Sequence, residues 1–155
     1  MTTKADFNAE EWSIVVEGPL YAGMRVVSAE RGGALGESLA MGRVYQEARL
    51  AHGESELLDE LVQSPPSLDP DRLREASGDI AAAVSQRLRE GMGIVEAKAT
   101  PPEVDAYKRF VMTVAQAVAS AHEGGFLGLG GKQISDAENQ ALDEISRALG
   151  TPPAA

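Results

Sequence analysis

The chain has 155 residues, with 14 Lys and Arg against 24 Asp and Glu, so its formal charge is −10, and it contains no cysteine. The length and an apolar share of 43% suit one folded domain, and the lack of cysteine excludes disulfides, thiolate metal sites and a cysteine nucleophile. The acidic balance disfavours nucleic acid as a partner. With no apolar run near the roughly 20 residues of a membrane span and no signal-peptide segment at the start, we expect a cytoplasmic protein.

The first predicted helix covers residues 9–17. Asn8 and Glu11 have the spacing of a capping box, in which each side chain accepts a hydrogen bond from the other residue's backbone N–H. The Gly18-Pro19 pair is predicted to end this helix, because proline is unfavourable inside a helix but suits the first turn of the next one. A second helix is then expected from residue 20 to the glycine pair at 32–33.

The middle of the chain predicts three further helical segments. One starts near residues 35–37 and ends at His52-Gly53, and its predicted apolar face consists of Leu39, Met41, Val44, Tyr45 and Ala48. A short helix is expected next, opened by Ser55 or Glu54. After the proline pair at 65–66, a long helical stretch is expected from residue 70 to residue 99, with glycines at 78, 91 and 93 as its weak points.

The last third of the chain predicts two helices around a glycine-rich loop. The first runs over residues 101–122, and its apolar positions cover a face broad enough for a central helix. Ser135 and Glu138 form a second capping-box pattern, which opens a helix that Gly150 ends. Since no convincing alternating strand pattern occurs, we expect an all-α fold, a single helical bundle over residues 1–155.

A diverged internal repeat is also predicted. Residues 26–33 align with residues 118–125, with five of the eight positions identical, and the apolar positions of the following helices match in phase. The repeat halves would cover about residues 19–50 and 101–150. We expect them to be related by an approximate two-fold axis, with flexible tails at residues 1–6 and 151–155.

The segment from Val114 to Gly150 resembles the tellurite-resistance TerB-like domain: an apolar helix, a glycine turn, then Ser-Asp-Ala-Glu opening an amphipathic helix. Residues 22–48 resemble it more loosely. The resemblance implies an all-helical domain of two such halves and a bacterial-type stress-response role. Acidic residues at the turns have been linked to metal binding in that family, but its frequent Asp-Gly pair is Arg31-Gly32 and Glu123-Gly124 here.

The candidate metal ligands near the two turns are Glu37, His122, Asp136 and Glu138. Carboxylate oxygens suit calcium or magnesium, and a histidine adds zinc or manganese. The competing interpretation is that Glu37 and Glu138 are helix-start residues favoured by the helix dipole. We predict no cofactor, with a divalent metal as the alternative.

The glycine-rich loop at residues 124–134 is the candidate partner-binding segment. It follows a predicted helix rather than a strand and lacks the residues of a phosphate-binding loop. Its apolar residues at 126, 127 and 129 either fold back onto the bundle or form an exposed tip that binds a protein partner.

The leading function is therefore a non-enzymatic helical interaction module, of the stress-response type that the resemblance implies. A divalent-metal-binding TerB-like domain and an enzyme of unknown reaction are the alternatives. With only two histidines, both near predicted helix ends, a Ser-His-acid triad is not expected, so we favour a protein that is not an enzyme. The sequence leaves the oligomeric state open.

Overall fold

The computed structural model describes residues 2–29, 34–64, 79–123 and 135–151. This part contains a short 3-10 helix, η1 (Lys4–Asp6), and the α-helices α1 (Ala9–Ala29), α2 (Ala34–Leu50), α3 (Glu56–Gln63), α5 (Ile80–Lys98), α6 (Pro101–Glu123) and α7 (Asp136–Leu149). No strand occurs among these residues, and the predicted all-α bundle is confirmed. None of the helices described here combines the length and apolar character that crossing a membrane requires.

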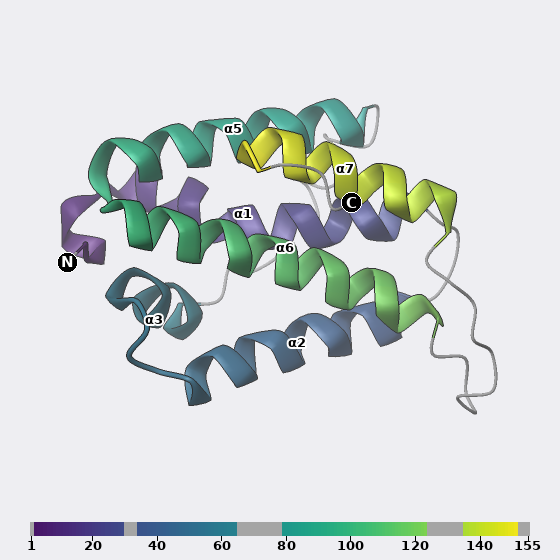
Figure 1. The fold of residues 1–155 in the computed structure, drawn as a ribbon, viewed down its shortest axis with the longest axis horizontal. Helices are drawn as coiled ribbons and strands as arrows, with labels where there is room; N and C mark the ends of the chain where they lie inside the picture. Colours follow the sequence, from purple (N-terminus) through teal and green to yellow (C-terminus); the bar gives the residue numbers. More distant parts are fainter. Residues whose placement is uncertain (1, 30–33, 65–78, 124–134, 152–155) are drawn as a thin grey trace.

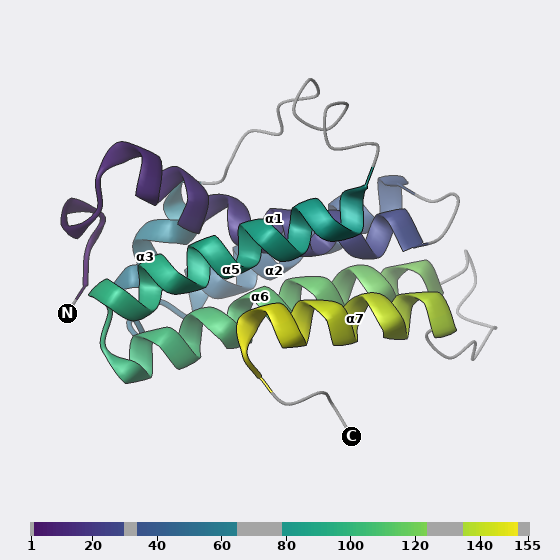
Figure 2. The same cartoon turned by 90° about the horizontal axis from the view of Figure 1, so that it is seen from above.

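Helix α6 forms the centre of the bundle. It contacts every other described α-helix, and in Figure 1 it crosses the middle of the molecule with α7 above it and α2 below it. Figure 2, seen from above, shows that α1 lies behind α6 in the view of Figure 1, and α5 packs mainly against α1. The prediction that residues 101–122 form a central helix is therefore confirmed. The largest fully buried side chains include Tyr107, Val111 and Val114 of α6 with Leu57, Leu61, Leu88, Ile145 and Leu149 of its neighbours.

The predicted capping box at the start of α1 is present. The backbone N–H of Asn8 donates to Glu11 Oε2 at 2.9 Å, and the backbone N–H of Glu11 donates to Asn8 Oδ1 at 2.8 Å. Phe7 and Trp12 pack against each other on either side of the cap, with ring centroids 5.5 Å apart. The polar cap and the apolar pair together fix where α1 begins.

The predicted break at Gly18-Pro19 is wrong, because α1 continues through both residues to Ala29. Proline at position 19 has no N–H to donate to the carbonyl oxygen of Val15, one turn earlier. The hydroxyl of Tyr107 on α6 supplies the missing bond and donates to Val15 O at 2.8 Å. The helix therefore tolerates the proline because a neighbouring helix satisfies the carbonyl that it leaves free.

The first residues of the chain, for which the sequence suggests a flexible tail, make defined contacts in the structure. Thr2 is buried, and both its backbone N–H and its hydroxyl donate to the carboxylate of Glu103, at 2.8 and 2.7 Å. Lys98 donates to the backbone oxygen of Asp6. Residues 2–6 thus lie against the connection between α5 and α6.

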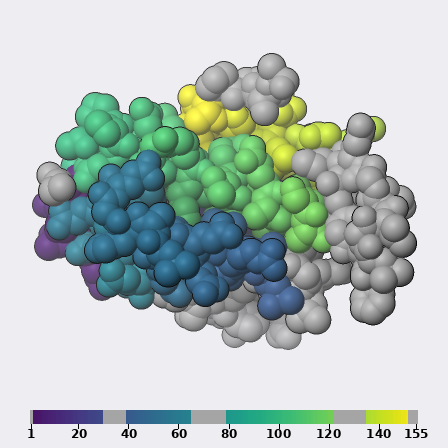
Figure 3. All heavy atoms as spheres, turned by 60° about the horizontal axis from the view of Figure 1, so that its bottom comes forward, coloured from purple at the N-terminus to yellow at the C-terminus, as the bar shows by residue number. Residues whose placement is uncertain are grey.

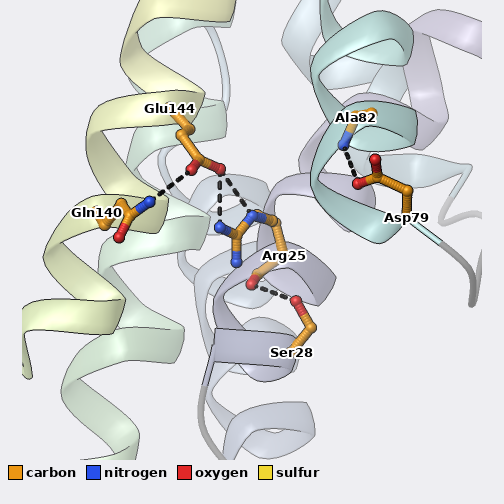
Figure 4. Close-up of polar contacts among 6 residues, drawn as sticks. All are labelled: Arg25, Ser28, Asp79, Ala82, Gln140 and Glu144. Carbon is orange, nitrogen blue, oxygen red and sulfur yellow. Dashed lines mark hydrogen bonds and ion pairs between the residues drawn. The ribbon is translucent and has the colours of Figure 1, made fainter.

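Helix α5 begins later than the sequence suggests. Asp79 has a non-helical backbone, and its side chain caps the helix by accepting a hydrogen bond from the backbone N–H of Ala82 at 3.1 Å (Figure 4). The predicted helical stretch from residue 70 to residue 99 is therefore interrupted at Asp79, which follows Gly78, one of its predicted weak points. Residues 65–78 lie outside the described part.

An ion pair joins the first and last helices of the bundle. Arg25 of α1 lies 2.8 Å from a carboxylate oxygen of Glu144 on α7, and Gln140 donates to the other oxygen of the same carboxylate (Figure 4). The Gly-Gly turns on which the internal repeat rests, 32–33 and 124–125, lie outside the described residues. The two-fold repeat therefore stays a prediction.

Candidate functional site

The structure assigns a capping role to one of the four predicted metal ligands. Glu138 is buried, and its carboxylate accepts the backbone N–H of Ser135 at 2.9 Å while Ser135 Oγ accepts the N–H of Glu138 at 3.2 Å. Asp136 beside it is exposed. The side chains of Glu37 and His122 lie outside the described part, and no group of three or more metal-binding side chains occurs within that part. The described residues thus support the helix-start interpretation of Glu138.

Replacing Ser135 by alanine is expected to lower the free energy of unfolding by about 0.5–2 kcal/mol, the usual effect of losing an N-cap. Thermal or chemical denaturation measures this change. Calcium, magnesium and zinc are expected to leave the melting temperature unchanged, because an ion that bound only the folded chain would raise it. A saturable rise with one ion that is lost in Glu138→Gln would instead establish the metal site.

The outward side of α2 carries two exposed leucines. At about 100° per residue, Leu39, Arg43, Gln46 and Leu50 fall on one side of the helix, and we call these four residues the α2 stripe. Leu39 is 67% exposed and Leu50 80%, and they are the exposed large hydrophobic residues of the described part. They stand three helical turns apart, about 16 Å along the axis.

The position of Leu39 corrects the sequence prediction, which placed it on the apolar face that packs into the bundle. Val44 and Tyr45 are buried and point towards the opposite side of the helix, where Met41 and Ala48 pack against the core with them. Leu39 lies about half a turn from the centre of that group. Helical angles calculated from the sequence would have revealed the exposure of Leu39, since the other residues of the predicted apolar face fall together on the opposite side of the helix.

The buried side of α2 contacts α6 through aromatic residues. The rings of Tyr45 and Phe110 meet edge to face with centroids 5.3 Å apart. The Tyr45 hydroxyl is buried and has no hydrogen-bond partner in the described part of the chain. Burial raises the pKa of Tyr45 to about 12, so the hydroxyl stays neutral at physiological pH.

Replacing Tyr45 by phenylalanine is expected to raise the free energy of unfolding by about 1 kcal/mol, because a buried hydroxyl without a partner is costly. Tyr107→Phe is the matched control and should lower it, since the Tyr107 hydroxyl is bonded to Val15. Chemical denaturation of the two variants decides the matter. Equal losses in both would show that the Tyr45 hydroxyl has a stabilising partner.

A shallow surface groove of about 470 Å³ runs between α2 and α6 next to the α2 stripe. Its walls carry small side chains, and Arg43 and Glu47 stand along its α2 edge; the lining residues are Ala40, Arg43, Val44, Glu47, Thr113, Gln116, Ala117, Ser120 and Ala121. Figure 3, which brings the bottom of Figure 1 forward, shows α2 in blue on the surface beside α6. The stripe and this groove form one continuous face.

The charges of this face differ from those of the whole chain. Residues 39–50 carry Arg43, Arg49 and Glu47, a local charge of 2 − 1 = +1, in a chain of −10. Arg49 donates to the backbone oxygen of Val62 at 2.7 Å. No ion pair or side-chain hydrogen bond engages Arg43 or Glu47 within the described residues. Both side chains therefore remain available to a partner.

Two other features bear on partner binding. The predicted partner-binding loop at residues 124–134 lies outside the described residues, so it stays a prediction. A second open groove, of about 750 Å³, runs along α6 towards the end of α7, and its lining includes Pro101, Met112 and Thr151. It lacks the pair of exposed leucines that distinguishes the α2 side.

No protein-family model, curated protein or solved structure matches the chain. The function is therefore inferred from the chemistry of the exposed surface.

Proposed function

We propose that the chain is a non-enzymatic protein-interaction module that binds its partner through the α2 stripe. The observation that carries this proposal is the exposure of Leu39 and Leu50 on the same side of one helix. Covering a leucine side chain that water otherwise surrounds gains about 1.5–3 kcal/mol. Two such residues on a rigid helix, with polar residues between them, are typical of a helix face that docks on another protein.

The packing of α2 adds a second line of support. Along residues 39–50, only Val44 and Tyr45 are buried, and seven positions are exposed. Most positions of this stretch of α2 therefore face away from the core. The free outward side is long enough, at about 16 Å between the leucines, to hold two or three turns of a partner helix.

The setting that we propose follows the resemblance to TerB-like domains over Val114–Gly150. It is a bacterial-type stress response in the cytoplasm, with a protein rather than a nucleic acid as partner. The charge of −10 supports the last point, because phosphate backbones repel an acidic chain.

A photo-crosslinking amino acid placed at position 50 or 39 in the source cells tests the proposal. We expect both positions to give the same crosslinked species, and position 89, an exposed site on α5, to give none. Leu39→Ser should reduce the adduct formed from position 50 while leaving thermal stability nearly unchanged. Identical adduct patterns from positions 50 and 89, or no adduct from either leucine position, would overturn the proposed function.

A further inference from the structure

We infer that the partner of the α2 stripe is a second copy of this chain, with the two α2 helices packed antiparallel across a two-fold axis. This inference rests on the proposed function and names its partner. A two-fold dimer brings the same surface of both copies together, so the surface must be complementary to itself. The α2 stripe satisfies this condition in its apolar residues, its charges and its shape.

The two leucines match each other in an antiparallel arrangement. We place the two-fold axis at the contact between the helices, at the height midway between residues 44 and 45 along α2. Residues of the two copies whose numbers add up to 89 then lie at the same height. Leu39 of each copy then faces Leu50 of the other, which closes both ends of the contact with an apolar pair. The two leucines of one copy are about 16 Å apart, so a single copy cannot bring them together.

The charges match in the same register. Arg43 of the α2 stripe and its neighbour Glu47 lie on the same flank of α2, since both line the groove beside α6. A two-fold axis perpendicular to both helices puts the same flank of each copy on the same side of the contact. Arg43 of one copy therefore meets Glu47 of the other at nearly the same height, and the contact repeats by symmetry. A parallel two-fold pair would instead put the flanks that carry Arg43 and Glu47 on opposite sides of the contact, so the two charges would not meet.

The centre of the contact permits close approach of the helices. Gly42 lies on the flank opposite the groove, and a Cβ atom added there would meet no atom within 4 Å. The exposed Gln46 side chain of the other copy lies at nearly the height of Gly42 in this register. A small residue facing a long polar one lets the two helix backbones approach without a clash.

The local charge also favours this face for self-association. Two chains of −10 repel each other over most of their surfaces. The segment from Leu39 to Leu50 carries +1, and meeting there keeps the acidic surfaces of the two copies apart. Charge repulsion between two copies is therefore smaller when they meet at this face than when they meet at a strongly acidic part of the molecule.

Engineered cysteines test the register directly, because the chain has no cysteine of its own. Leu39→Cys and Leu50→Cys chains, one of them tagged, are oxidised separately and as a mixture. The mixture is expected to form the crosslinked heterodimer about tenfold faster than either variant alone forms its homodimer, because pairing raises the effective concentration of the two thiols. The second pair in that heterodimer, Leu50 facing Leu39, stays intact.

Charge exchange tests the same contact without covalent bonds. In sedimentation experiments, Arg43→Glu and Glu47→Arg are each expected to lose self-association, because they place like charges opposite each other. Mixing the two variants should restore a heterodimer, and the double exchange R43E/E47R should restore the homodimer. Thermal melts of each variant confirm that the folded chain is being compared.

The outcomes separate this inference from the proposed function. Fastest crosslinking of Leu39→Cys with itself, equal rates in all three samples, or charge variants that associate like the wild type would each overturn the antiparallel pair. If the adducts from positions 39 and 50 then contain a different protein, the interaction module stands and only self-association fails. If those positions give no specific adduct either, both proposals fail.

Discussion

Replacing Gly18 by alanine is expected to lower the free energy of unfolding by about 2–4 kcal/mol. A Cβ atom at position 18 would lie 2.2 Å from the hydroxyl oxygen of Tyr107 and 3.4 Å from its Cζ. The Tyr107 side chain is fully buried and its hydroxyl is bonded to Val15 O, so it has no free space to move into. The clash would push the Tyr107 hydroxyl away from Val15 O, the carbonyl oxygen that Pro19 leaves without a backbone donor.

Gly91→Ala is the matched control for this prediction. Gly91 is also buried inside a helix and faces the same hydroxyl, but its added Cβ would lie at 3.7 Å, an ordinary contact distance. Alanine has the higher helix propensity, so this variant should be neutral or more stable by up to about 1 kcal/mol. Chemical denaturation of both variants provides the comparison. Equal effects at the two positions would contradict the role of the close approach at Gly18.

A double-mutant cycle separates the clash from the lost hydrogen bond. Tyr107→Phe removes the hydroxyl and leaves Val15 O without a donor, at a cost of about 1–3 kcal/mol. G18A in that background should cause no further loss, because the atom that it would clash with is gone. Pro19→Ala in the Tyr107→Phe background should recover stability, since the new backbone N–H replaces the missing donor. Additive effects of G18A and Y107F would disprove the coupling.

The same residues show what the sequence could and could not predict about the fold. The capping pairs Asn8–Glu11 and Ser135–Glu138 lie three residues apart, so local chemistry determines them and the sequence reveals them. The continuity of α1 through Pro19 depends on Tyr107, which is 88 residues away along the chain. A local rule predicts a break there correctly for an isolated helix, but it contains no information about a donor supplied by another helix.

The candidate site, too, could be predicted from the sequence only in part. The exposure of Leu39 and Leu50 follows from helical angles once the helix boundaries are known, although the sequence prediction grouped Leu39 with the buried residues. The neighbours of that face do not follow from the sequence, because the groove beside Arg43 depends on how α2 packs against α6. The capping-box spacing of Ser135 and Glu138 predicts the two bonds that Glu138 makes in the structure, whereas the metal hypothesis rests on residue types alone.

The carboxylate of Glu103 is expected to make stability depend on acid pH. It lies at the third position of α6 and is buried, and it accepts four hydrogen bonds, from the backbone N–H and the hydroxyl of both Thr2 and Thr100, at 2.7–3.0 Å. Burial alone would raise the pKa of Glu103, but these four donors outweigh it and lower the pKa from 4.5 to about 2. The folded state therefore binds the proton less readily than the unfolded chain.

A lowered pKa in the folded state stabilises the protein above the pKa of the unfolded chain, and this contribution disappears as the pH falls towards the folded value. Glu103→Gln should accordingly lower the free energy of unfolding at pH 7, on the order of 1–3 kcal/mol after allowance for solvent screening at the protein surface. The difference between wild type and variant should stay constant down to about pH 4.5. It should then shrink between pH 4.5 and pH 2, because the wild-type carboxylate becomes protonated.

Glu96→Gln is the control, since that carboxylate is 56% exposed and its only described ion pair, with Lys108, is 3.6 Å long. It should change stability by less than about 0.5 kcal/mol at any pH in this range. Denaturant titrations of the three proteins at several pH values give the comparison. A Glu103→Gln difference that persists unchanged at pH 2 would show that Glu103 acts through packing rather than charge. A difference that fades in the expected window would instead establish that the buried carboxylate ties the start of the chain to the central helix by virtue of its charge.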